Sequence, residues 1–142
     1  MDFDLTDEQR LLREQARDLV DREIAPKAAE LDRSARWPAE IVDRLGELGF
    51  LGIAVPAEFG GAGLDTVSYV LAMEEVSRGC ASCGVIMSVN NSLFCDPLLK
   101  FGTPEQRREI LSPCAPSSSC ASACSTSRAS CYWSDGRRWI ST

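Results

Sequence analysis

The stretch of sequence that decides the fold runs from Val55 to Leu93 and reads VPAEFGGAGLDTVSYVLAMEEVSRGCASCGVIMSVNNSL. It begins with a tight glycine loop at residues 60–63, and an acidic residue, Asp65, follows closely. Two helical patterns come next, and the second, from about Ser82 to Phe94, has no charged side chain. A helix that is neutral all round is expected to be buried or to line a pocket.

Upstream of this stretch, apolar residues recur every three or four positions, which predicts amphipathic helices. The first helix opens with a capping box formed by Thr6 and Gln9, and Pro26 either kinks or ends it. Its apolar face comprises Leu11, Leu12, Ala16, Leu19, Val20 and Ile24.

Two further helices flank the glycine loop. One starts at Trp37-Pro38 and ends near Gly49, which suits a helix C-terminus because glycine tolerates positive φ. Its predicted buried stripe comprises Ile41, Leu45 and Leu48. Asp65 caps the next helix, which ends at Arg78-Gly79. Its apolar positions are Val67, Val70, Leu71 and Val76.

Two short helical segments follow the neutral helix. One covers residues 97–101, and the other opens with a capping box at Thr103 and reaches Leu111. Five or six helices joined by short loops predict an all-α helical bundle over residues 1–111. Residues 112–142 differ sharply, because ten of these 31 residues are serine and four are cysteine. Such a segment buries too little apolar surface to offset its ordering entropy, so we expect a tail that is disordered or poorly packed.

Length, charge and hydropathy argue against several functions. The 142 residues allow one modest domain, and no run approaches the roughly 20 apolar residues that span a bilayer. A net charge of −6 without a basic stripe argues against binding to nucleic acid or to an anionic membrane. Residues 1–4 lack the basic character of a secretory signal or transit peptide. We therefore expect a cytoplasmic protein, or a mitochondrial matrix protein if the sequence is a mature eukaryotic form.

The seven cysteines indicate reduced thiols, because their number is odd and no secretion signal precedes them. Cys80, Cys83 and Cys95 fall in helical patterns, where free thiols behave as small hydrophobic groups. Zinc binding by Cys80 and Cys83 with Cys120 and Cys124 is disfavoured by the three-residue spacing of the second pair and by the lack of histidine. A redox role for Cys80 and Cys83 lacks the βαβ context of such motifs. We expect no metal site.

Neither the glycine loop nor the carboxylates predict a catalytic centre. Residues 60–63 lack the sequence context of a phosphate-binding loop, so we interpret them as a connector. The paired helical carboxylates fall on faces opposite the apolar stripes, which predicts solvation or ion pairing. They are Asp43, Glu47, Glu74 and Glu75. Without histidine, the chain has no Ser/His or Cys/His nucleophile pair.

The neutral helix is the main candidate for a binding function. By their spacing, Ile86, Asn90 and Leu93 share one face, with Met87 adjacent. Core packing is the simpler explanation of such a face. A pocket wall is the other explanation, and the Asn90-Asn91 pair favours it because buried amides need partners.

Four segments give the chain a family resemblance: VPAEFGGAGLD at 55–65, AMEEVSRGCASCGV at 72–85, IMSVNNSL at 86–93 and KFGTPEQRREIL at 100–111. From about Leu5 to Leu111, the chain resembles the N-terminal helical domain of the acyl-CoA dehydrogenases, most closely the short-chain members. The resemblance covers about three quarters of the chain.

This resemblance implies a helical N-terminal domain, a middle β-domain and a C-terminal helical bundle, with FAD held mainly by the last two and a neighbouring subunit. It implies that a glutamate of the C-terminal domain removes the α-proton of an acyl thioester while the flavin takes the β-hydride. The product would be a trans-2-enoyl-CoA, and an electron-transfer flavoprotein would accept the electrons. The resemblance also implies a homo-oligomer, typically a tetramer.

The same resemblance implies a substrate site on the neutral helix. Ile86, Met87, Asn90 and Leu93 would form the wall of the acyl-chain pocket. The bulk of Ile86 and Met87 would shorten that pocket and favour short acyl groups.

The chain departs from the family pattern after Leu111, where residues 112–142 look like a shifted reading frame. The catalytic glutamate and nearly all flavin contacts would lie beyond Thr142. We therefore expect this polypeptide alone neither to hold FAD stoichiometrically nor to oxidise acyl-CoA. The alternative function is a non-catalytic helical module that binds partner subunits or another protein through exposed apolar faces.

Overall fold

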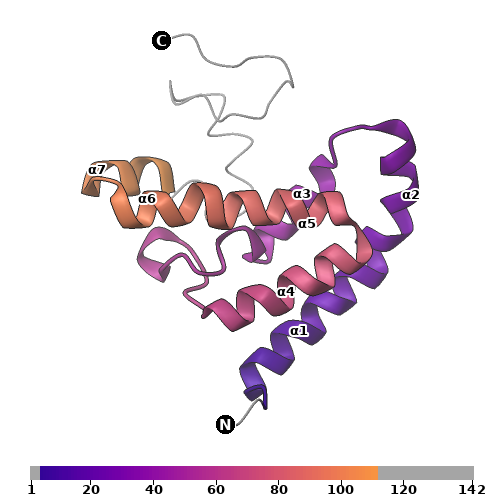
Figure 1. Cartoon of the computed structure of the whole chain (residues 1–142), viewed down its shortest axis with the longest axis horizontal. Coiled ribbons are helices and arrows are strands. Elements are labelled where there is room, and N and C mark those ends of the chain that lie inside the picture. Colours follow the sequence, from indigo (N-terminus) through magenta and orange to yellow (C-terminus); the bar gives the residue numbers. More distant parts are fainter. Residues whose placement is uncertain (1–3, 112–142) are drawn as a thin grey trace.

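The computed structural model describes residues 4–111, and all regular structure within them is helical (Figure 1). The elements are α1 (Asp7–Leu19), η1 (Val20–Ile24), α2 (Ala25–Ser34), α3 (Ala39–Glu47), η2 (Phe50–Gly52), η3 (Ala57–Phe59), α4 (Thr66–Gly79), α5 (Ala81–Ser88), η4 (Val89–Cys95), α6 (Asp96–Phe101), α7 (Pro104–Gln106) and η5 (Arg107–Leu111). The prediction of an all-α bundle is confirmed for this part of the chain. The disorder predicted for residues 112–142 lies outside the described residues.

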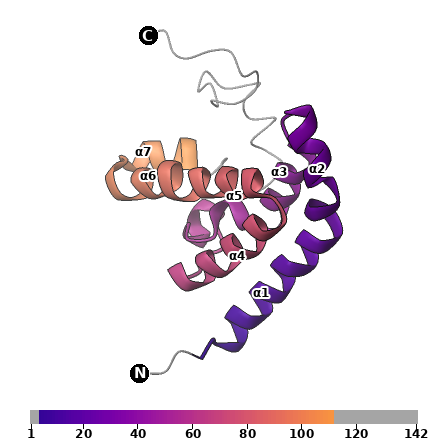
Figure 2. The same ribbon diagram turned by 45° about the vertical axis from the view of Figure 1, so that its right-hand side comes forward.

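Two long helical rods make up most of the bundle (Figures 1 and 2). α1, η1 and α2 follow one another as the first rod, and α5, η4 and α6 form the second. α4 lies between the rods and packs on both α1 and α5, while α3 and η2 contact α5 and η4 from the other side. None of the helices between residues 4 and 111 is both long and apolar enough to cross a membrane.

The first rod passes Pro26 without breaking. A proline inside an α-helix collides with the carbonyl group four residues earlier and removes one hydrogen bond. Here the turn before the proline is widened, and the Ala25 N–H donates to the Val20 carbonyl five residues back. Such a π-turn gives the ring room. The helical run therefore continues to Ser34, although the sequence left open whether Pro26 ends it.

The second rod has the same kind of π-turn before Pro97. The Asp96 N–H donates to the Asn91 carbonyl five residues back, and Pro97 lies in the first turn of α6. The segment predicted as a separate short helix at 97–101 is therefore continuous with the neutral helix. The resulting run has no break between Ala81 and Phe101.

The predicted helix caps form, and two of them are linked. The Thr6 hydroxyl accepts the Gln9 N–H, and the Gln9 side chain accepts the Thr6 N–H in return. The Asp65 carboxylate accepts the Ser68 N–H at 2.7 Å. The Gln9 amide also donates to Asp65 at 2.9 Å, which ties the start of α1 to the start of α4. Thr103 caps α7 by the same reciprocal arrangement.

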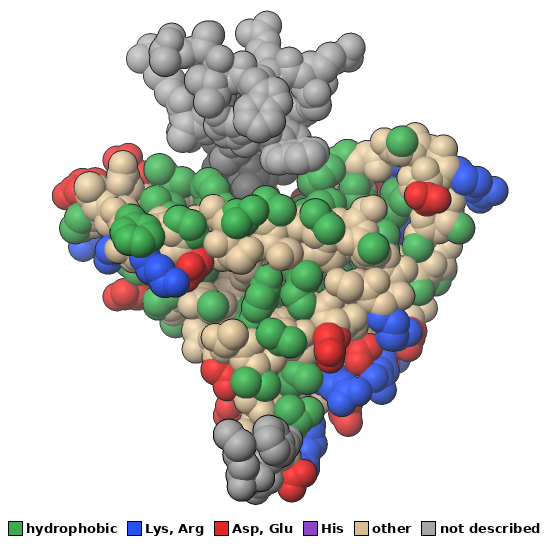
Figure 3. Space-filling model, viewed as in Figure 1, with side chains coloured by type: hydrophobic (Ala, Val, Ile, Leu, Met, Phe, Trp, Pro, Cys, Tyr) green, Lys and Arg blue, Asp and Glu red, His purple; other side chains and the backbone are tan. Residues whose placement is uncertain are grey.

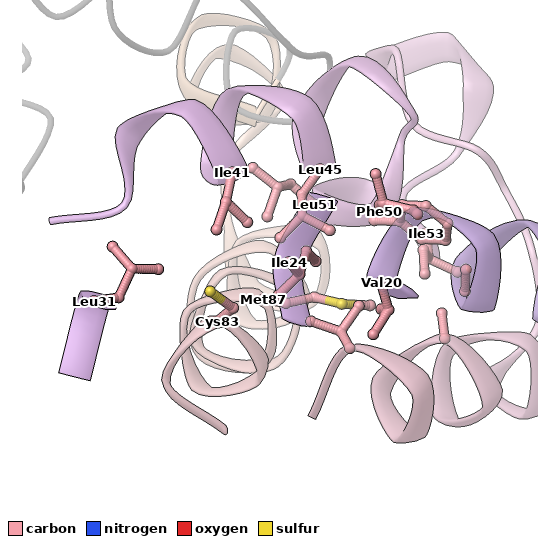
Figure 4. Packing of buried hydrophobic residues seen from close by; sticks show 14 residues of the cluster. Val20, Ile24, Leu31, Ile41, Leu45, Phe50, Leu51, Ile53, Cys83 and Met87 are labelled. Atoms are coloured by element: carbon pink, nitrogen blue, oxygen red, sulfur yellow. The ribbon is translucent and has the colours of Figure 1, made fainter. Parts of the chain in front are cut away.

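One apolar cluster holds the two rods, α3 and α4 together (Figure 4). Its largest fully buried side chains are Val20, Ile24, Leu45, Ile53, Val76 and Met87. A smaller cluster of Val55, Cys95 and Leu111 joins the loop before η3 to η4 and η5.

Several predicted core positions are wrong. Leu48 is 45% exposed, because α3 ends at Glu47 and Gly49, with φ of +78°, redirects the chain. Val67 and Val70 are exposed because they share a face of α4 with the exposed Glu74. Leu11 is exposed too, whereas the other five residues of the face predicted for the first helix are buried or partly buried.

Candidate functional site

Asn91 fixes the second rod to the connector between α3 and α4. Its side-chain oxygen accepts the Ile53 N–H at 3.1 Å. Its amide nitrogen donates to the Phe50 carbonyl at 2.9 Å and to the Met87 carbonyl at 3.0 Å. All of these groups are buried, so each hydrogen bond replaces one that water would otherwise make. The amide thus sets the position of η4 relative to η2.

Asn90 adds a second link between the same two segments. Its amide nitrogen donates to the Leu51 carbonyl at 2.6 Å and contacts the Cys95 sulfur at 3.7 Å. The pair of asparagines therefore satisfies backbone groups of a short non-α segment that has few partners of its own. This is a positioning role that the sequence indicated only as a need for amide partners.

The structure does not bring the four predicted substrate residues onto one surface. Met87 is fully buried in the main core, and Asn90 and Ile86 are half-buried. Leu93 is 71% exposed. Ile86 and Met87 are adjacent in α5 and therefore point in different directions, and the widened turn of η4 rotates Leu93 away from the face that regular α-helical spacing predicts. That these four residues line a substrate pocket remains a prediction.

The outer face of the second rod is apolar and exposed. Its members are Val85, Val89, Leu93, Phe94 and, in α6, Phe101. Figure 3 shows hydrophobic side chains along the α5 and η4 part of this rod, whereas charged side chains gather over α1, the adjoining part of α4 and the α6–α7 end. The sequence identified the lack of charge but not that one side of the helix would stay uncovered. Contiguous apolar surface of this kind marks a binding surface.

Two shallow depressions lie elsewhere on the domain. One is lined by Leu5 and side chains of α1, and the second lies among α1, η1 and α3, where Leu48 and Phe50 contribute. Neither includes Ile86 or Leu93, so neither of them is the predicted acyl pocket.

The glycine loop does not fit a phosphate or a flavin. The five N–H groups of residues 60–64 donate to carbonyl oxygens between Gly52 and Ala57. A Cβ at Gly61 would collide with the backbone and side chain of Val55, and Gly63 has a φ of +66°. No N–H of this loop is left to hold an anion. The interpretation of the loop as a connector therefore agrees with its geometry.

Glu75 is the main electrostatic feature that sequence reasoning missed. It is only 4% exposed and lies between α1 and α4, so the prediction of solvation is wrong, and that of ion pairing is confirmed. Its carboxylate accepts hydrogen bonds from Arg17 at 2.6 Å, Arg78 at 3.0 Å and Arg13 at 3.3 Å. Arg78 also pairs with Asp21 at 2.7 Å.

These guanidinium groups control the protonation of Glu75. Hydrogen bonds from Arg17 first, and then from Arg78 and Arg13, lower the pKa of Glu75 to about 2, although burial alone would raise it. The carboxylate is therefore charged at neutral pH and cannot serve as a proton donor. Glu74, Asp43 and Glu47 are exposed, as predicted, and Glu47 pairs with Arg44 at 2.9 Å.

The described cysteines are free thiols. Cys83 and Cys95 are buried, as expected for small hydrophobic groups, and Cys80 is half-buried at the junction of α4 and α5. Within residues 4–111, no group of three or more histidine, cysteine or carboxylate side chains could hold a metal ion. The alternative zinc pair, Cys120 and Cys124, lies outside the described residues.

The chain matches the family model described as "Acyl-CoA dehydrogenase, N-terminal domain" over residues 6–117. It is 51% identical over 110 residues to the mitochondrial short-chain specific acyl-CoA dehydrogenase of Bos taurus, and this match covers 78% of the chain and 27% of the relative.

Two solved structures share the fold. One is butyryl-CoA dehydrogenase from Megasphaera elsdenii, with a TM-score of 0.77 and 34% identity over 81% of this chain and 31% of that chain. The other is a chain in a structure of the electron transferring flavoprotein of Acidaminococcus fermentans, with a TM-score of 0.78, 41% identity and coverage of 81% and 30%. The chain thus spans less than a third of each of these proteins.

Proposed function

The chain belongs to the acyl-CoA dehydrogenase family, and from this premise we propose that it forms the helical N-terminal domain of a short-chain acyl-CoA dehydrogenase. The observation that carries the proposal is the family match over residues 6–117, which includes every helix from α1 to η5. The reaction is the α,β-dehydrogenation of a short acyl-CoA to a trans-2-enoyl-CoA. The enzyme is a homo-oligomer that passes electrons to an electron-transfer flavoprotein.

FAD would supply the hydride-accepting chemistry of this reaction. The glycine loop offers no fitting contact for it, since its N–H groups are all engaged within the domain. We therefore assign no step of the reaction to residues 4–111. Their role in the enzyme is to shape the substrate site and to support the other domains. The purified 142-residue polypeptide is expected to be colourless, and a stoichiometric flavin absorption band would contradict this assignment.

Within that role, the second rod provides the wall for the acyl chain. Ile86, Asn90 and Leu93 border the substrate, and Met87 supports them from the core. Two observations support this proposal: the rod from Ala81 to Cys95 carries no charge, and its outer face is apolar and exposed. Acyl pockets are lined by such side chains because they exclude water from the hydrocarbon chain.

The test is the chain-length preference of a full-length short-chain acyl-CoA dehydrogenase with alanine at the position matching Ile86. Ile86→Ala removes three carbons while keeping a good helix former. We expect kcat/KM for hexanoyl-CoA relative to butyryl-CoA to rise about tenfold, the usual scale for added room in an apolar pocket. The matched control is Val67→Ala, an exposed aliphatic position on α4 away from the second rod, which should leave the ratio unchanged. Equal ratios in both variants and the parent enzyme would contradict the proposed wall.

A second candidate is a non-catalytic helical module that binds another protein. The observation that favours it is the exposed apolar face, in which Phe101 is 85% and Leu93 71% exposed. The two candidates differ in what covers this face. For the enzyme domain, grafting the chain into a full-length relative restores catalysis. For the module, the graft is inactive and the isolated chain binds its partner with the same face.

A further inference from the structure

Two cysteines meet where α4 ends and α5 begins. Cys80 closes α4 and is also the N-cap of α5, with extended backbone angles of φ −156° and ψ 110°. Cys83 is the third residue of α5. The side chain of an N-cap residue reaches over the third helical position, as in a capping box. The Cys83 thiol accordingly contacts the Cys80 thiol, and both are free.

The two thiols differ in access to solvent. Cys80 is half-buried, whereas Cys83 is fully buried beside Met87 in the core (Figure 4). Burial, and then the neighbouring Cys80, raise the pKa of the Cys83 thiol to about 12. Cys80 is therefore the more accessible residue of the pair, and the buried Cys83 has the Cys80 thiol beside it.

The helix start favours chemistry at Cys80. Cys80 is the N-cap of α5, next to the first N–H groups of that helix, which carry partial positive charge. Redox-active cysteine pairs with two intervening residues exploit this position. A βαβ unit places a cysteine pair at a helix N-terminus. Here the start of α5 provides that position without a βαβ unit, so the lack of one in the sequence does not argue against a redox role.

The pair is poorly suited to a merely structural bridge. A disulfide between residues three apart closes a very short loop, so it restricts the unfolded chain little. Within the described residues, no third ligand joins the pair to hold a metal. Short redox-active bridges of this kind occur in compartments where structural disulfides are rare.

We propose that Cys80 and Cys83 form a reversible dithiol–disulfide site that exchanges with small disulfides such as oxidised glutathione. The Cys80 sulfur, after losing its proton to solvent, attacks the oxidant and displaces one glutathione thiolate. The Cys83 sulfur then attacks Cys80, loses its proton and displaces the second glutathione. The protein loses two protons and two electrons, and one oxidised glutathione becomes two reduced ones.

The test uses the full chain with Cys114, Cys120, Cys124 and Cys131 changed to serine, so that only the described cysteines remain. The protein is equilibrated with defined ratios of reduced and oxidised glutathione, acid-quenched, alkylated in denaturant and mapped by mass spectrometry. We expect a disulfide between Cys80 and Cys83, with Cys95 still alkylated. The ratio of oxidised to reduced glutathione at which half of the chains carry the disulfide should be at least about tenfold lower for the native chain than for the urea-unfolded chain. The reason is that the fold holds the two sulfurs together.

Two further variants separate the steps and guard against loss of folding. Cys83→Ser should stop at a mixed disulfide between Cys80 and glutathione. Cys80→Ser should leave Cys83 unreacted as long as circular dichroism shows the native helix content. The proposal is overturned if the parent chain accumulates only mixed disulfides, if native and unfolded chains oxidise at the same ratio, or if Cys95 replaces either partner.

Discussion

The Glu75 carboxylate lies between α1 and α4, where three guanidinium groups neutralise it and water is largely excluded. Its pKa is about 2 in the folded chain, compared with 4.5 for the free side chain. A lowered pKa contributes stability that is fully present above pH 4.5 and is lost as pH falls towards 2. The contribution at neutral pH is about 3 kcal/mol by proton linkage.

Replacing this charge should lower the stability of the domain at neutral pH and make its stability less dependent on pH in the acid range. Glu75→Gln keeps the shape of the side chain but leaves Arg17 and Arg78 without their charged acceptor. We expect the free energy of unfolding in urea to fall by about 2–3 kcal/mol at pH 7 and by about 1 kcal/mol at pH 3. The matched control is Glu74→Gln, because Glu74 is the exposed neighbour. If the free energy of unfolding changed with pH in the same way for both variants, the stability of the domain would not depend on the ionisation of Glu75.

Asn91 is the second residue whose replacement should markedly lower the free energy of unfolding. Asn91→Leu leaves the Ile53 N–H and the Phe50 carbonyl buried without the partner that each has in the native domain. Each such group costs about 1–3 kcal/mol, so we expect a loss of about 3 kcal/mol in urea unfolding. Ser92→Ala is the control, since its hydroxyl is exposed and bonds only within the rod. A loss below 1 kcal/mol for Asn91→Leu would contradict its positioning role.

At the scale of elements, the glycine loop fixes the path of the chain between α3 and α4. The loop carbonyl of Val55 accepts the Gly63 N–H at 2.8 Å, and Gly61 passes directly over Val55. Because backbone atoms occupy the space that a Cβ needs, Gly61→Ala should displace the loop. We expect a loss of about 1–3 kcal/mol in thermal or urea unfolding, the usual range for overpacking. Ala62→Ser, at the exposed next position, should change stability by less than about 0.5 kcal/mol.

Locally encoded features of these elements could be predicted from the sequence. The caps at Thr6, Asp65 and Thr103 each use a side chain within three residues, so short spacing patterns reveal them. Most of the core follows from helical periodicity for the same reason. Features that depend on distant segments could not be predicted. Arg13 and Arg17 lie 62 and 58 residues from Glu75, and no local pattern indicates that they meet it.

The candidate site was predictable as a segment but not as a surface. The lack of charge identified the helix that carries Ile86 and Leu93. Regular α-helical spacing then assigned Leu93 to the same face as Ile86 and Asn90, and the π-turn before Pro97 changes that assignment. The hydrogen bonds of Asn90 and Asn91 to η2 are long-range contacts that spacing does not encode.

At the scale of the whole molecule, the second rod presents apolar side chains such as Leu93 and Phe101 on an exposed face. A pocket needs walls on several sides, and neither of the two depressions described on residues 4–111 includes this face. In the proposed enzyme, other domains would therefore lie against this rod to complete the acyl pocket. On this proposal, a domain without a catalytic group of its own would still determine substrate length.

The most direct test is a graft. Residues 6–111 of this chain replace the matching segment of butyryl-CoA dehydrogenase from Megasphaera elsdenii, and kcat/KM for butyryl-CoA is measured on the purified, flavin-loaded protein. The same segment of the bovine short-chain enzyme, in the same host, controls for the junctions. We predict that the graft retains turnover within about tenfold of this control and the same preference for short acyl chains. A folded, flavin-loaded graft without butyryl-CoA oxidation, beside an active control, would contradict the account.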